Sequence, residues 1–190
     1  MPSAETGSSI VVKVGGSLYD LPDLGPRLHR WLLSRETDSV LLVPGGGALA
    51  DAVRELDATH GLGEETGHWL ALRALTVAAH FLARLLPDCA VVSHPDRWRR
   101  GTIAVLDARA FAIADEGKPG ALPRSWAVTS DSIAARAARV GGVRRLILLK
   151  SVTIPDNIDW PEAARRGWVD EFFPTAAVEL EVRSVNFKEF

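Results

Sequence analysis

The chain has 190 residues, of which 47% are hydrophobic and 24% are charged, and its formal net charge is −2 at pH 7. This composition predicts one globular domain over 1–190 with room for a sizeable core, and the small net charge excludes a general attraction to nucleic acid or membranes. The single cysteine, Cys89, excludes an intrachain disulfide and a cysteine metal cluster. Because no run approaches a membrane span, we expect a cytoplasmic protein.

The first half of the chain alternates buried strands with helices. The apolar run over 10–14 predicts a strand buried on both faces, and it ends at Gly15 and Gly16. Another apolar strand, over 39–43, runs into three consecutive glycines. In chain order the expected elements are a strand at 10–14, a helix at 21–33, a strand at 39–43, a helix from 48 to about 57, a helix at 64–86 and strands at 89–93 and 102–106.

The second half continues the alternation. A glycine- and proline-rich loop is expected over 115–123, and a helix from about 129 to 140 that the following two glycines stop. A buried strand at 145–149 ends at Lys150, and a short helix at 159–167 and a half-buried strand at 178–182 follow. The pattern predicts an α/β fold, a three-layer α/β/α sandwich with a mainly parallel central sheet.

Lys13 interrupts an otherwise apolar strand. A buried, unpaired ammonium group is costly, so Lys13 needs an anionic partner if it is buried. Phosphate is a natural partner, because the neighbouring glycines let backbone N–H groups approach an anion. The alternative is that the side chain extends from the strand end into water. Both interpretations also apply to Lys150.

Two further features fall where α/β folds bind ligands, beyond the C-terminal ends of strands. Gly45, Gly46 and Gly47 join a strand to a helix N-terminus, which is typical of an anion site or simply of a tight turn. Ser130 and Asp131 open a helix, where the acid either has a structural role, orients a lysine or holds magnesium. Together these cations, N–H donors and the acid suit phosphoryl transfer.

Two other phosphate-binding patterns are excluded. The chain contains no Gly-x-x-x-x-Gly-Lys-Ser/Thr segment, which rules out a P-loop. Residues 45–50 match the loose dinucleotide fingerprint, but the acids at the required spacing, Glu64 and Glu65, begin a helix instead of ending a strand. The context of that fingerprint is therefore wrong.

Three motifs, in this order, resemble those of the amino acid kinase family. The family includes bacterial UMP kinase, acetylglutamate kinase, aspartokinase and isopentenyl phosphate kinase. The resemblance covers roughly residues 9–153, and 67–75 with 122–126 are most similar to a subgroup that contains the aminomethylfuran-methyl phosphate kinase of methanofuran synthesis. The motifs are Val12-Lys13-Val14-Gly15-Gly16-Ser17-Leu18, Val43-Pro44-Gly45-Gly46-Gly47 and Thr129-Ser130-Asp131-Ser132-Ile133-Ala134.

The resemblance implies a catalytic set of three residues. Lys13 would stabilise the transferring phosphoryl group, Lys150 would be the second cation, and Asp131 would organise the two lysines. It also implies ATP with Mg²⁺ as the phosphoryl donor, a small phosphorylated metabolite as the partner, and a homo-oligomer. No metal ligand is assigned to the protein itself.

The resemblance also implies two sets of binding residues. The residues of the first set, which would hold ATP, are Gly15, Gly16, Ser17 and Ser130. The residues of the second set, which would hold the acceptor, are Gly45, Gly46, Gly47 and His68. For His68 the alternative is a packed or solvated helical histidine.

The chain departs from the family after its last core strand. Thr153 stands where the family usually has Asp, Ala127 stands where the subgroup has a polar residue, and the fold is expected to be shortened on its C-terminal side. The segment Arg97-Trp98-Arg99-Arg100 is either a lid over an anionic acceptor or a solvated turn.

These features support two main hypotheses. The first is a small-molecule kinase that transfers the ATP γ-phosphoryl group to a phosphate monoester, in one-carbon cofactor synthesis. The second is a non-catalytic protein that binds an oxyanion or phosphorylated metabolite, because the nucleotide-binding segment is reduced. A kinase acting on a carboxylate or carbamate is a third option.

Overall fold

A parallel sheet of six strands forms the centre of the computed structural model, which describes residues 9–35, 39–98 and 101–190. The strand order is β3-β4-β2-β1-β5-β6, and all neighbouring strands run parallel. The α/β class predicted from the sequence is therefore confirmed. The strands are β1 (Ser9–Val14), β2 (Ser39–Pro44), β3 (Ala90–Val92), β4 (Ile103–Leu106), β5 (Arg145–Lys150) and β6 (Glu181–Asn186).

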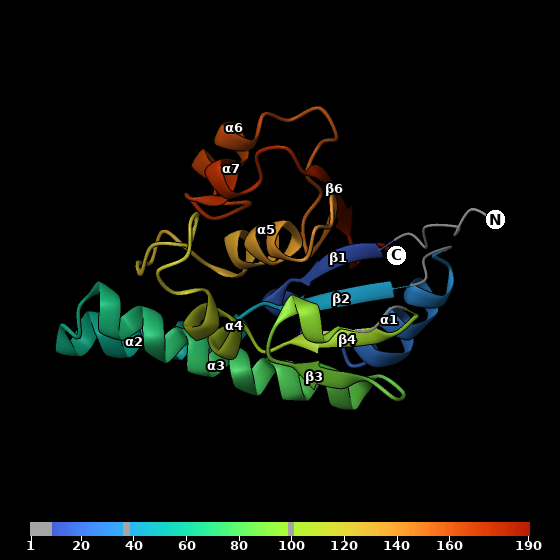
Figure 1. The fold of residues 1–190 in the computed structure, drawn as a ribbon, viewed down its shortest axis with the longest axis horizontal. Coiled ribbons are helices and arrows are strands. Elements are labelled where there is room, and N and C mark those ends of the chain that lie inside the picture. Colours follow the sequence, from blue (N-terminus) through green and yellow to red (C-terminus); the bar gives the residue numbers. More distant parts are fainter. Residues whose placement is uncertain (1–8, 36–38, 99–100) are drawn as a thin grey trace.

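Helices connect these strands and cover the sheet (Figure 1). Two 3-10 turns, η1 (Gly16–Leu18) and η2 (Pro95–Arg97), follow β1 and β3. The α-helices in the described part of the chain are α1 (Leu24–Leu33), α2 (Gly47–His60), α3 (Glu64–Leu85), α4 (Ala108–Asp115), α5 (Ser130–Val140), α6 (Trp160–Arg165) and α7 (Phe173–Ala176).

Alternation along the strands produces an apolar core on each face of the sheet. On β1, Val11 packs with α5, whereas Ile10 and Val12 pack on the opposite face with α1. Because β1 lies between β2 and β5 with helices on both faces, almost all of it is buried, as its apolar sequence predicts. The two cores give the fold its three layers.

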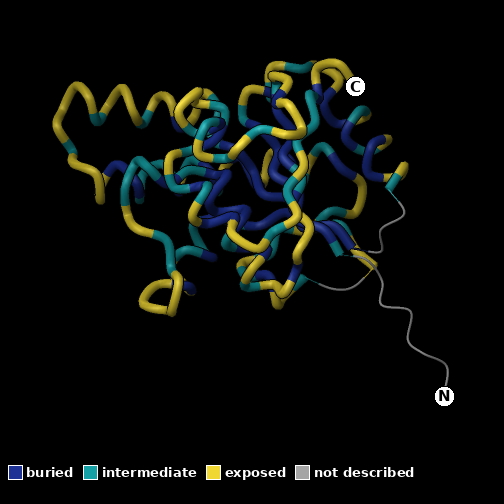
Figure 2. Tube along the Cα trace, turned by 90° about the horizontal axis from the view of Figure 1, so that it is seen from above, coloured by how far each residue is buried: buried dark blue, intermediate teal, exposed yellow. Residues whose placement is uncertain are grey.

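The helices differ in how deeply they are buried. Of the residues in α2, only Ala50 is buried, and Figure 2 shows this helix as a largely exposed arm at one end of the molecule, with the buried strands at the centre. By contrast, α5 buries most of its length against the sheet. In Figure 1, α6 and α7 lie above α5 on the side away from β1. The first turn of α5 is thus enclosed on both sides.

Most predicted elements are present, with two additional helices and one shift. Asp107 is the N-cap of the additional helix α4, and its carboxylate accepts hydrogen bonds from the backbone N–H groups of Arg109 and Ala110. The four-residue helix α7 was also not predicted. The strand expected at 178–182 was placed too early, because Glu179 adopts a positive φ of 69° and pairing with β5 begins only at Glu181.

Candidate active site

Lys13 and Lys150 lie on the same face of adjacent parallel strands, near their C-terminal ends. Lys13 is next to Leu148 in the register of β1 and β5, and both lysines point to the face covered by α5. They are only 6% and 9% exposed, so neither extends into water. The solvated-lysine alternative is therefore wrong for both.

The carboxylate of Asp131 lies between the two ammonium groups. Lys13 Nζ is 3.0 Å from Oδ1, and Lys150 Nζ donates to Oδ1 at 2.9 Å and to Oδ2 at 2.7 Å. Asp131 is in the first turn of α5 and is 4% exposed. One carboxylate thus holds two buried lysines, which leaves the cluster with a net positive charge.

Burial and charge act against each other in this cluster. Burial favours the neutral carboxyl group of Asp131, but the charges of Lys13 and Lys150 outweigh this and lower its pKa. Burial, reinforced by the charge of Lys13 and opposed by Asp131, lowers the pKa of Lys150 to about 8. Lys150 therefore titrates close to neutral pH, and an anionic ligand beside it would raise its pKa and favour the protonated form.

The two glycine turns contact each other directly beside the lysines. Gly15 N–H donates to Leu149 O at 2.9 Å, and Gly45 N–H donates to Val14 O at 2.8 Å, so each turn is tied to a neighbouring strand. A side chain on Gly16 would collide with the backbone of Gly47, which itself has a φ of +54°. Only glycines allow this approach, as expected where backbone N–H groups surround an anion.

A cavity of about 190 Å³ opens above these turns. It is bounded by β1, the two turns, α2, α3 and the first turn of α5. Asp131, Lys150, Gly15 and Gly45 lie just behind this lining. The predicted site residues that line it are Lys13, Gly16, Ser17, Gly46, Gly47, His68 and Ser130. The structure therefore brings the predicted residues together at one edge of the sheet.

Trp126 also lines this cavity, a role that was not predicted from the sequence. Its indole Nε1 donates to Asp57 Oδ2 at 2.7 Å, and the guanidinium of Arg54 lies 5.2 Å from the ring centroid. A Cβ atom on Gly67 would come within 2.7 Å of the indole. A glycine inside an apolar helix was the signal for this close packing.

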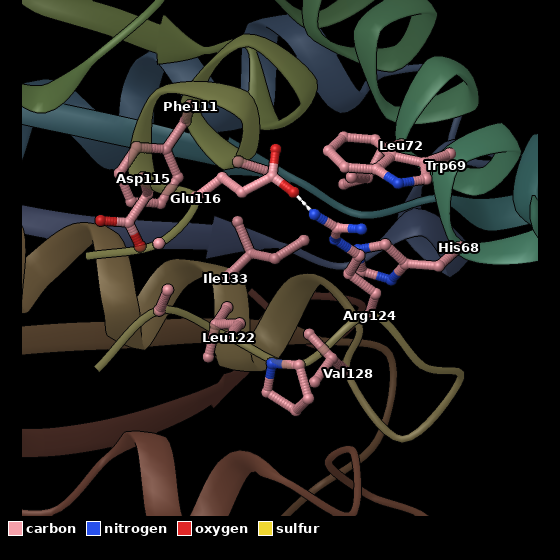
Figure 3. Close-up of a pocket in the computed structure, with 14 residues that line it drawn as sticks. His68, Trp69, Leu72, Phe111, Asp115, Glu116, Leu122, Arg124, Val128 and Ile133 are labelled. Atoms are coloured by element: carbon pink, nitrogen blue, oxygen red, sulfur yellow. Dashed lines mark ion pairs between the residues drawn. The ribbon is translucent and has the colours of Figure 1, made fainter. Parts of the chain in front are cut away.

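A second cavity, of about 300 Å³, adjoins the first and is shown in Figure 3. His68, Leu72, Val128 and Ile133 line both cavities. The rest of the wall comes from α3, α4 and the 115–123 loop, and much of it is apolar, with Trp69, Phe111 and Leu122. Burial lowers the pKa of His68, which is 7% exposed, so the histidine is neutral at pH 7.

Ion pairs close the rim of the second cavity. Arg124 pairs with Glu116, as drawn in Figure 3, and also with Glu65 on α3. Nearby, Arg136 donates to both carboxylate oxygens of Asp115, each at 2.8 Å. The loop over 115–123 is thus fixed to α3 and α5 by arginines, and its apolar residues face inward.

The segments that depart from the family are hydrogen-bonded in place. Ser17 Oγ lies 2.8 Å from Ser151 Oγ, and Asn186 donates to Thr153 Oγ1 at 2.9 Å. Thr153 therefore links the loop after β5 to β6.

The described part of the segment over 97–100 does not lie over the lysines, as the lid alternative would require. Pro95 contacts Gly141 at the C-terminal end of α5, and Trp98 Nε1 donates to Thr102 O at the N-terminal edge of the sheet, opposite the lysines. Arg99 and Arg100 lie outside the described residues. Arg97 and Trp98 thus fit the alternative, a surface turn.

Within residues 9–35, 39–98 and 101–190, no group of three acidic, histidine or cysteine side chains is arranged to hold a metal ion. Both oxygens of Asp131 are engaged by lysines. Of the roles that the sequence left open, this geometry fits the orientation of lysines. In the same ranges, no helix combines the length and the apolar character needed to cross a bilayer.

Comparison with known proteins identifies relatives of this architecture. No protein-family model matches the chain. It is similar to the [5-(aminomethyl)furan-3-yl]methyl phosphate kinase of Methanocaldococcus jannaschii, with 27% identity over 146 residues, which is 75% of this chain. The chain spans 65% of the length of that relative.

Solved structures extend the comparison to the fold. The uridylate kinase of Archaeoglobus fulgidus superposes with a TM-score of 0.63 over 94% of this chain and 90% of its own, at 16% identity. The UMP kinase of Bacillus anthracis gives a TM-score of 0.65 over 96% and 88%, at 14% identity. Both structures share the fold of this chain, in agreement with the resemblance to the amino acid kinase family noted from the sequence. The sheet of this fold positions the lysine–aspartate cluster described above.

Proposed function

We propose that this protein is a small-molecule kinase that transfers the γ-phosphoryl group of ATP to a phosphate monoester. The observation that supports this most strongly is the pair of buried lysines on Asp131, next to two interlocked glycine turns. Phosphoryl transfer spreads negative charge over oxygens, so fixed cations and N–H donors can supply most of the catalysis. The name of the Methanocaldococcus relative, a phosphate kinase, agrees with this reaction.

The position of each residue relative to the first cavity gives its proposed role. Lys13 lines the cavity and contacts the transferring phosphoryl group, while Lys150 adds positive charge from behind it. Gly16 and Ser17, together with Ser130, bind the phosphates of ATP, and Gly46 and Gly47 face the acceptor phosphate. Mg²⁺ would neutralise charge on the phosphates, held by phosphate oxygens and water because Asp131 is already engaged.

The apolar second cavity would take the organic part of the acceptor. The two cavities meet at His68, so one acceptor molecule could place its phosphate in the first cavity and its small apolar part in the second. A volume of about 300 Å³ and a largely apolar lining suit a compact ring. An aminomethylfuran phosphate, as in the name of the relative, and hence a role in one-carbon cofactor synthesis, is the specific acceptor that we propose to test first. We further propose that the protein is a cytoplasmic homo-oligomer.

The test is a coupled assay of ADP release with ATP–Mg²⁺ and a panel of small phosphate monoesters. We expect turnover with a small, ring-bearing monoester, and a loss of about 1000-fold in Lys13→Ala with unchanged circular dichroism. A folded Lys13→Ala variant with full activity would refute the role of Lys13. Binding of phosphorylated metabolites without binding of ATP, measured by calorimetry, would instead support the non-catalytic alternative.

A further inference from the structure

The first turn of α5 is held by a carboxylate from a distant part of the chain. Asp170, between α6 and α7, accepts hydrogen bonds at Oδ2 from Thr129 N–H at 3.0 Å, Thr129 Oγ1 at 2.9 Å and Ser132 N–H at 3.0 Å. Its Oδ1 accepts from Ser132 Oγ. These donors flank Asp131 in sequence, so Asp170 fixes the turn on which the lysine-binding carboxylate stands.

We propose that Asp170 is a positioning residue of the active site, which holds Asp131 between Lys13 and Lys150 and balances their charge. The kinetic part of this inference rests on the proposed kinase function. Asp170 itself lies on the other side of the α5 turn and makes none of the described contacts with the lysines.

The arrangement differs from an ordinary helix cap. Thr129 occupies the N-cap position, yet its side chain makes no capping bond and donates to Asp170 instead. A threonine hydroxyl normally caps a helix without help from elsewhere. Here the cap is supplied from outside the helix, so the position of the turn depends on the α6–α7 segment.

The α6–α7 segment is anchored well enough to support the turn. Phe173 is fully buried and packs edge-on against Trp160, with ring centroids 5.2 Å apart. Phe172 N–H donates to Ala127 O at 3.1 Å, next to the start of α5. Because the residues following Asp170 are fixed in the core, the carboxylate is presented to α5 from a rigid base.

Charge provides a second reason to place a carboxylate here. The two lysines and Asp131 together carry a net positive charge, and an ionised Asp170 makes the group of four neutral. Burial and the nearby charge of Asp131 raise the pKa of Asp170, whereas the Thr129 and Ser132 donors favour its ionised form. A neutral asparagine has one acceptor oxygen in place of two, so it would hold the turn less firmly and would also leave the lysines less stabilised.

The chain offers a direct way to observe this effect. It contains four lysines, at positions 13, 118, 150 and 188, so lysine labelled with ¹³C at Cε gives four NMR signals to assign. Lys150 faces Lys13 and Asp131, and its titration near pH 8 reports on both. In Asp170→Asn we expect the Lys150 titration to move down by about half a pH unit or more, because Asp131 is held less firmly against the Lys150 ammonium group.

Activity gives the second measurement on the same variant. We expect kcat to fall about 100-fold, because Asp131 is no longer held in place, with the KM for ATP changed by less than about threefold. The matched control is Asp159→Asn, which removes an exposed carboxylate at the start of α6 that makes no capping bond. It should alter neither kcat nor the Lys150 titration.

Ser132→Ala removes one of the four hydrogen bonds that Asp170 accepts, and it is the variant to use if Asp170→Asn does not fold. We expect it to change kcat and the Lys150 titration in the same direction, by smaller amounts. A purely structural cap would lower the melting temperature and leave the Lys150 titration and kcat of the folded variant as in the wild type, which would overturn the proposal. A wild-type protein without kinase activity would count against the proposed function only, since the titration needs no turnover.

Discussion

Asp131→Asn tests the electrostatic design of the site most severely. Asparagine has the volume of aspartate but no charge, so the two ammonium groups would face each other without compensation. They now share Oδ1 at 3.0 and 2.9 Å, and so lie at most about 6 Å apart. At an effective dielectric constant of about 20, two unit charges at that distance repel by about 3 kcal/mol.

The variant can relieve this repulsion only by moving a lysine or by releasing a proton. Burial already lowers the pKa of Lys150 to about 8, so without Asp131 the neutral form dominates at pH 7.5. Either response removes a positioned cation from the site. Converting about 3 kcal/mol into rate gives an expected loss of about 100-fold in kcat.

The assay is ADP release at pH 7.5 with saturating ATP–Mg²⁺ and acceptor, and Asp159→Asn serves as the control with equal charge change. Circular dichroism and the melting temperature establish that the variant is folded. An Asp131→Asn protein that is folded and retains kcat within about threefold of the wild type would refute the reasoning, because the lysines would then need no carboxylate between them.

Three further predictions follow from the same geometry. The kcat/KM of the wild type should fall as pH rises through about 8, where Lys150 loses its proton, and a flat profile to pH 9.5 would contradict this. Because the pKa of Lys150 is lower in the folded protein, the unfolded chain binds more protons between about pH 8 and 10.5. Denaturant titrations should therefore show Lys150 adding to the free energy of unfolding as pH rises through that window. Gly16→Ala should destabilise the protein by about 3 kcal/mol or more, because the two glycine turns must separate. The control is Gly142→Ala, at a φ of +66° with open space around it, which should cost about 1 kcal/mol. Equal melting temperatures of the two variants would show that the turns do not interlock. Ala121→Phe should fill part of the second cavity and raise the KM for the acceptor about tenfold without changing the KM for ATP, and an equal change in both would place the acceptor elsewhere.

The central strands and their lysines could be predicted because their signals lie within a few residues in the sequence. Apart from Lys13, the run over 10–14 is apolar on both faces, and the structure places it in the middle of the sheet. Lys13 and Lys150 were conspicuous because each interrupts or ends such a run. Since parallel strands end at one edge of a sheet, their proximity followed from topology.

Other features depend on contacts that no local pattern contains. Asp170 lies 38 and 41 residues from its partners Ser132 and Thr129, and nothing near it in sequence distinguishes it from a surface acid. The second cavity depends on the path of the 115–123 loop, which arginine pairs fix to α3 and α5. By contrast, α4 had a readable signal in Asp107, an N-cap directly after a strand.

The central claim is that Lys13 and Lys150 converge, through Asp131, on the phosphates of the proposed reaction. A crystal structure of the protein with Mg²⁺ and a non-hydrolysable ATP analogue tests it most directly. We predict that the ammonium nitrogen of Lys13 lies about 3 Å from a terminal phosphate oxygen, with Lys150 still on Asp131 and next to the phosphates. Phosphates bound away from both glycine turns, with neither lysine in reach, would contradict the account.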